Sequence, residues 1–258
     1  MTNDMSIESY LAQGGMLSNP ANVPPRYRAA LLKLMATFVD SALAGAAGFA
    51  DIINEGPGIK ARIAAAKIVL EKSDNADRVL KIMGDFGADT ERYADHHPWT
   101  ARLHRDADIG QQRSDHDMRL AVFNYPLEGW ADAVVMNFLM GHAVTVQLAE
   151  LSQVSYQPLA EVFRALAPIE AHHAELAEEG LERLAKDATS PADLQADLQA
   201  AVDYWWPRVA ASFGTDGSDK FDGLKALGLR HSPNAALKTR WQAEVGAKLT
   251  RLGLSIPA

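Results

Sequence analysis

The stretch "LEGWADAVVMNFLMGHAVTVQLAEL", residues 127–151, carries apolar residues on almost every turn and predicts a long apolar helix. Apolar residues at spacings of three and four predict three more long helices, over residues 26–53, 57–87 and 159–185. The turn signals "NEGPG", "FNYP" and "SYQP" separate these segments. Four long helices joined through turns predict an all-α four-helix bundle around a single core.

The remaining segments are predicted from their composition. Residues 1–25 are rich in glycine, proline and asparagine, and we expect a surface lead-in. Residues 88–120 are polar and rich in His and Asp, so we expect a loop insertion with one short helix at most. Residues 26–258 are expected to form one domain, in which the bundle is followed by additional C-terminal helices over residues 191–213, 219–228 and 233–252.

Composition excludes several classes of protein. A chain of 258 residues with 48% hydrophobic residues can bury a large core. The net charge of −8, with scattered Lys and Arg, gives no surface for nucleic acid. Since there is no cysteine, any metal must be held by His and carboxylates. No apolar run is predicted to reach the roughly 18 to 20 residues that cross a bilayer, and no secretory signal begins the chain, so a cytoplasmic protein without a membrane partner is expected.

The segment "PIEAHHAEL", residues 168–176, places Glu170 and His173 three positions apart, on one face of a helix. A di-iron centre in a helical bundle takes one carboxylate from each of two helices and a Glu-x-x-His pair from each of the other two. Alone, such a pair is weak evidence, because most lie on solvated helix surfaces. Its meaning depends on what the other helices supply.

Longer motifs resemble a known family. The segments "FNYPLEGWADAVVMNFL", "SYQPLAEVFRALAPIEAHHAE", "YWWPRVAASFG" and "LGLSIPA" are similar to the catalytic subunit of bacterial ring-1,2-phenylacetyl-CoA epoxidases, the phenylacetic acid catabolic family. Upstream, "YRAALLKLMATFVDSALAG" and "GPGIKARIAAAKIV" match in register. The resemblance spans about residues 26–257, apart from an insertion between about 88 and 118. It implies a ferritin-like fold, a di-iron oxygenase ancestry and an acyl-CoA substrate.

The resemblance also places the family's six metal positions on this chain. They fall on Ala42, on Lys72 and Asn75, on Gly141, and on Glu170 and His173. Four of the six are therefore substituted, and one carboxylate with one imidazole cannot hold two iron ions. We expect Lys72, if it points inward, to pair with Glu170. Lys72, Glu170 and His173 are thus candidate residues of a vestigial cavity, with no cofactor.

Two alternatives remain open. A rearranged metal site, with iron as its cofactor, could add neighbouring side chains to Glu170 and His173, and the candidates are Asp40, Glu71, Asp74, His142 and His172. No common shift along the helices brings these residues to the family's positions, because each residue step turns a side chain by about 100°. The second alternative is a metal-free enzyme in which Lys72, Glu170 or His173 acts as acid or base.

The insertion carries a second group of candidate ligands. These are His96, His97, His104 and His116, among Asp106, Asp108, Asp115 and Asp117. Their spacings match no recognised ligand pattern, so we expect a solvated loop that serves a partner or gates the site. Arg105, Arg113 and Arg119 are generic candidates for contacting CoA phosphates, and the tryptophans Trp205 and Trp206 are expected in the core.

Taken together, the sequence predicts a non-catalytic or scaffold subunit of a multicomponent acyl-CoA ring oxygenase. Its predicted partner is a paralogous ferritin-like oxygenase subunit or a second copy of itself, and it could contact an acyl-CoA. The alternatives are an active oxygenase with a rearranged metal site and the metal-free enzyme. Whether the chain is itself an enzyme is not decided by these residues.

Overall fold

A computed structural model describes residues 6–109, 116–186, 191–215 and 217–257. Within these ranges the chain is helical, and its one extended pairing is an isolated bridge between Leu17 and Tyr156. The helices are α1 (Ile7–Ala12), α2 (Pro25–Ile52), α3 (Gly58–Asp85), α4 (Thr90–His96), α5 (Trp130–Leu151), α6 (Gln157–Lys186), α7 (Pro191–Ala211), α8 (Ser218–Ala226) and α9 (Asn234–Arg251), with short 3-10 turns at Pro20–Asn22, Ile53–Glu55 and Ala121–Asn124. The all-α prediction is confirmed.

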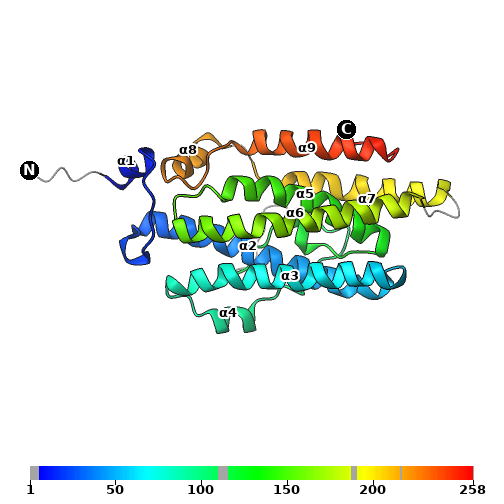
Figure 1. The fold of residues 1–258 in the computed structure, drawn as a ribbon, viewed down its shortest axis with the longest axis horizontal. Helices are drawn as coiled ribbons and strands as arrows, with labels where there is room; N and C mark the ends of the chain where they lie inside the picture. Colours follow the sequence, from blue (N-terminus) through cyan, green and yellow to red (C-terminus); the bar gives the residue numbers. More distant parts are fainter. Residues whose placement is uncertain (1–5, 110–115, 187–190, 216, 258) are drawn as a thin grey trace, which may run out of the picture.

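The four long helices α2, α3, α5 and α6 lie side by side, and α7 and α9 cover the bundle on one side (Figure 1). Helix α5 packs against α6, α7 and α9, and its N-terminal residues are buried from Asp132 to Met136. A helix that is covered on several sides must be apolar all round. This explains why the segment 127–151 shows so little polar face.

Asp132 fastens the start of α5 to two other segments. It accepts hydrogen bonds from both terminal nitrogens of Arg105, at 2.6 and 3.0 Å, from Trp205 Nε1 at 2.8 Å and from the Glu128 backbone N–H at 3.0 Å. The motifs "WAD" and "WWP" therefore meet at one buried carboxylate. Trp205 and Trp206 are buried, as expected from the sequence, and Arg105 is engaged here rather than free for a phosphate.

The lead-in is less superficial than predicted. Leu11, Leu17 and Val23 are buried against the bundle, and Leu17 exchanges backbone hydrogen bonds with Ser155 and Gln157 at the start of α6. The prediction of a surface segment is wrong for these side chains. Turn-rich composition predicted the irregular backbone correctly but could not show that its few apolar residues find partners.

The insertion contains one short helix, α4, as expected, but it is not a solvated loop throughout. His96, His104 and His116 are exposed, whereas the side chain of His97 is only 3% exposed and Asp117 is buried. The solvated-loop interpretation is therefore wrong for His97 and Asp117. Arg119 is also buried, held by Asp117 and three backbone carbonyls. Arg113 and Asp115 lie outside the described residues.

Two helical segments of the described chain are long and apolar enough to cross a membrane by length and composition alone, Pro25–Glu55 and Trp130–Leu151. The sequence-based statement that no apolar run reaches this length is therefore wrong. Core helices of bundles meet the same two criteria, and 67% of the apolar window of α5 is buried inside the protein. The burial of this helix against α6, α7 and α9 accounts for its composition.

Candidate functional site

Glu170 lies at the centre of the candidate site, on the face of α6 that packs against α3. Its side chain is 2% exposed. Lys72 Nζ donates to Glu170 Oε2 at 2.9 Å, and Asn75 Nδ2 donates to Glu170 Oε1 at 2.8 Å. Lys72 and Asn75 lie three positions apart on α3, so both reach the same facing carboxylate. The ion pair expected between Lys72 and Glu170 is present.

The environment keeps Glu170 ionised. Burial by itself raises the pKa of a carboxyl group, but the charge of Lys72 and the hydrogen bond from His173 outweigh it, and the pKa of Glu170 is lowered. Glu170 is thus a carboxylate that is compensated by a lysine ammonium. A buried pair of this kind fixes the position of two helices more reliably than it adds stability.

His173 uses its two ring nitrogens for two different carboxylates. Nδ1 lies 3.3 Å from Glu170 Oε2, and Nε2 lies 2.8 Å from Glu71 Oε2. These nitrogens point to opposite sides of the ring, so Glu71, His173 and Glu170 cannot converge on one cation in this arrangement. Glu71 is also 3.9 Å from Lys67, near the protein surface.

The other positions that the resemblance assigns to metal ligands offer no carboxylate or imidazole. Ala42 has no donor atom, and Asn75 points its amide nitrogen at Glu170, while its Oδ1 is buried without a hydrogen-bond partner among the described residues. At Gly141, an added Cβ would lie 3.1 Å from Ala174 Cα and 3.2 Å from Ala174 Cβ. A carboxylate at position 141 would therefore require α5 and α6 to move apart.

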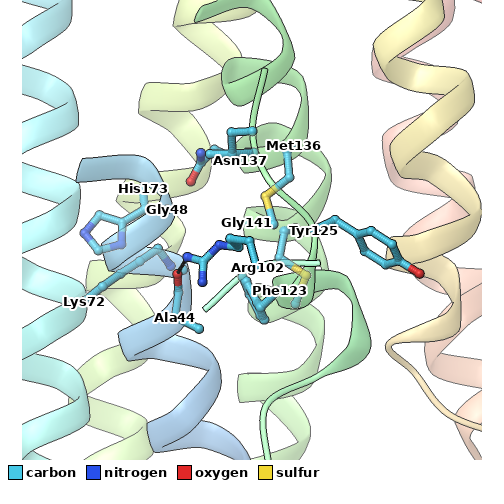
Figure 2. A pocket seen from close by; sticks show the side chains of 13 residues that line it. Ala44, Gly48, Lys72, Arg102, Phe123, Tyr125, Met136, Asn137, Gly141 and His173 are labelled. Atoms are coloured by element: carbon cyan, nitrogen blue, oxygen red, sulfur yellow. Dashed lines mark hydrogen bonds between the residues drawn. The ribbon is translucent and has the colours of Figure 1, made fainter. Parts of the chain in front are cut away.

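A second basic side chain faces the same space. Arg102, from the insertion, donates to the Ala44 carbonyl of α2 at 2.7 Å and lines a cavity of about 30 Å³ together with Lys72 and His173 (Figure 2). This volume holds about one or two water molecules. Two cationic side chains, a close contact between α5 and α6 and, among the described residues at this site, only one fully buried carboxylate do not fit a di-iron centre.

Comparison with known proteins agrees with the motifs. Residues 16–258 match the model of the phenylacetic acid catabolic protein family. The chain belongs to this family. It is also 23% identical, over 261 residues, to one of the subunits of the 1,2-phenylacetyl-CoA epoxidase of Escherichia coli (strain K12), in an alignment that covers 100% of this chain and 78% of that relative.

Within this family member, the residues proposed for a rearranged site lie apart. Asp74 pairs with Arg78 at the surface, and His172 is half-exposed beside Glu175. His142 lies between Glu178 of α6 and Glu244 of α9. Burial, and then the nearby charge of Lys248, lower the pKa of His142. Asp40 faces the insertion. Only Glu71 of these candidates joins His173.

A much larger cavity, of about 580 Å³, adjoins the Lys72–Glu170 pair. Its lining is mostly apolar and comes from α2, α5 and the region around α8, for example Phe38, Val144 and Phe221. Four basic residues and one carboxylate complete it: Lys33, Lys72, Lys220, Arg230 and Glu170. The volume is typical of pockets for small organic ligands, and the basic residues favour an anionic one.

Sequence reasoning missed Arg102 and the contact at Gly141. A signal for Arg102 was present in "AGAAG", residues 44–48, because small residues on a helix often mark the close approach of another segment. An added Cβ at Gly48 would lie 2.9 Å from Arg102 Nη2, and one at Gly45 would lie 3.0 Å from Phe123 Cε1. These two glycines make room for the insertion and for the segment that follows it.

Proposed function

We propose that this member of the phenylacetic acid catabolic family is a non-catalytic, cytoplasmic subunit of a multicomponent oxygenase that acts on an acyl-CoA thioester. The observation that carries the proposal is the position of Lys72 Nζ, 2.9 Å from the one family carboxylate that this chain retains. An ammonium there supplies the positive charge that Glu170 would otherwise share with a metal. The bundle can then keep its shape without metal.

The Escherichia coli relative supports a role in an assembly. It is named as one subunit of an epoxidase, which implies that it works together with other subunits. We propose a paralogous ferritin-like oxygenase subunit with a complete metal site as the partner, and a second copy of this chain as the alternative. In such an assembly this chain would shape the pocket for the acyl-CoA and would support the active partner.

A metal-free enzyme is the second candidate, and the large cavity favours it. Lys72 and Glu170 both line that cavity, so a ligand in it could meet an ammonium and a carboxylate at the same wall. The ion pair between them weakens this reading, since each group is already engaged with the other. A rearranged oxygenase site has less support, because its candidate ligands lie apart.

Metal content tests the proposed function. The chain is purified without chelators, incubated anaerobically with ferrous iron, and analysed by plasma mass spectrometry beside a Glu170→Ala, His173→Ala double variant. We expect wild type and double variant to retain the same iron content, because neither holds a di-iron centre. Stoichiometric iron that the double variant loses would overturn the proposal. Iron that both proteins bind equally belongs to another site.

A further inference from the structure

A group of potential metal ligands lies outside the Glu170 site, where the insertion packs on α2. Asp40 comes from α2, His97 follows α4, and Asp117 lies near the end of the insertion. One ligand atom from each of these residues lies within 4.8 Å of the other two. His97 Nε2 is 3.1 Å from Asp40 Oδ2 and 3.5 Å from Asp117 Oδ1.

The buried imidazole of His97 has no hydrogen-bond partner among the described residues. Its side chain is 3% exposed, and neither ring nitrogen makes a hydrogen bond, although Nε2 faces both carboxylates. Tyr93 and Trp99 stack on it, at centroid distances of 5.7 and 5.8 Å and interplanar angles of 17° and 10°. These rings fix the orientation of the imidazole. A buried polar group without a partner is costly, and a bound cation would supply the partner that Nε2 lacks.

Hydrogen bonds from neighbouring groups orient the two carboxylates, as is usual for metal ligands. Asp40 is fully buried and accepts from the Met118 N–H at 2.6 Å and from the Tyr93 hydroxyl. Asp117 accepts from the Arg119 N–H at 3.0 Å and from Arg119 Nε at 2.8 Å. Hydrogen bonds of this kind orient ligating carboxylates and leave lone pairs free for a cation.

We propose that Asp40, His97 and Asp117 bind a divalent transition-metal ion, for which Zn²⁺ is the representative. Two ligands that each lie about 2.1 Å from a cation are about 3.0 Å apart at a right angle and about 3.4 Å apart at a tetrahedral angle. The distances from His97 Nε2 to the two carboxylates match these values. One imidazole with two carboxylates suits Zn²⁺ better than Mg²⁺ or Ca²⁺, which prefer oxygen ligands alone.

The ion would fasten two separate parts of the insertion, at His97 and at Asp117, to Asp40 of α2. Between His97 and Asp117 the chain delivers Arg102 to the cavity beside Lys72, so the ion would hold this segment against the bundle. Such a role is structural, and binding to the folded chain must then raise its thermal stability. In the alternative arrangement no metal ion binds. A proton on His97 would then offset the charge of Asp40, and Arg119 would offset that of Asp117.

Zinc binding distinguishes the two arrangements. The full chain is dialysed against chelator, then against buffer, and titrated with Zn²⁺ in a calorimeter; bound metal is counted by plasma mass spectrometry. His97→Phe keeps an aromatic ring in the stack but removes the ligand. Asp117→Asn keeps an acceptor for Arg119. A His96→Ala, His104→Ala variant controls for exposed histidines, and Glu170→Ala, His173→Ala controls for the other site.

We expect one Zn²⁺ per chain in wild type and in both controls. His97→Phe and Asp117→Asn should each lower the affinity for Zn²⁺ by more than about 10-fold, because loss of a residue that only orients a ligand already lowers metal affinity by about that factor. Zn²⁺ should raise the melting temperature of wild type and controls, but not that of His97→Phe. No stoichiometric Zn²⁺ in wild type would overturn the proposal in favour of the proton. Zn²⁺ lost in the His96, His104 variant would assign it to the surface.

Discussion

At the scale of single residues, the candidate site is organised around one buried negative charge, that of Glu170. Glu170 is buried and ionised, and three donors on two helices meet it: Lys72, Asn75 and His173. Removing a metal from a ferritin-like bundle leaves buried carboxylates without compensation, which costs several kcal/mol. In this chain Lys72 supplies that compensation for Glu170.

Replacing Lys72 tests this account. Lys72→Met removes the ammonium, leaves Glu170 buried with its charge uncompensated, and should lower the free energy of unfolding by about 3 kcal/mol, because breaking a buried pair from one side is strongly destabilising. The double variant Lys72→Met, Glu170→Gln should recover most of the loss. Urea unfolding of the two variants and wild type measures both effects. If Lys72→Met alone were as stable as wild type, the Lys72–Glu170 pair would not contribute to the stability of the fold.

At the scale of helices, α5 packs against α6 so closely that position 141 has little room for a side chain. Gly141 of α5 lies close to Ala174 of α6, with 3.1 Å between the position of an added Cβ and Ala174 Cα. The neighbour is backbone, so it cannot turn away as a flexible side chain could. The absence of a side chain at position 141 is therefore a condition of this helix packing.

Gly141→Ala should destabilise the chain by about 1 to 3 kcal/mol, the usual cost of overpacking a core, in spite of the better helix propensity of alanine. Gly180→Ala on α6 is the matched control, since its Cβ would meet Val134 Cγ1 at an ordinary 3.4 Å. This control should gain up to about 1 kcal/mol. Thermal and urea unfolding compare the two. Equal gains in both variants would contradict a tight contact at Gly141.

Local patterns predicted the helices, and register predicted the Lys72–Glu170 pair. Spacings of three and four are properties of one helix, so α2, α3, α5 and α6 follow from the sequence within a few residues at each end. The burial of His97 and Asp117 could not be predicted in this way. It depends on Asp40, more than fifty residues earlier in the chain, and on how an irregular segment folds back over α2. The apolar contacts of Leu11 and Leu17 are non-local in the same sense.

At the scale of the whole molecule, the large cavity is the feature that several elements build together. Helices α2, α3, α5 and α6 and the chain around α8 all contribute to its wall. The chain has a net charge of −8, yet four of the five charged residues on this wall are basic. An apolar cavity of about 580 Å³ with basic residues fits a ligand that joins an apolar group to phosphates, as an acyl-CoA does.

We therefore expect phenylacetyl-CoA, used as a probe, to bind, and the lysines of the cavity to contribute to its affinity. Lys33 and Lys220 are exposed, so we expect Lys33→Glu, Lys220→Glu to weaken binding by about 10-fold, near the upper range for exposed ion pairs, and to lower its salt dependence. Lys60→Glu, Lys81→Glu makes the same change in net charge on exposed lysines outside the cavity and should bind like wild type, because distant charges are screened. Calorimetric titration at two salt concentrations measures all three proteins. Equal losses of affinity in the two variants would show that the overall charge of the protein, and not this cavity, attracts the ligand. If wild type did not bind phenylacetyl-CoA, the cavity would not be a site for this acyl-CoA.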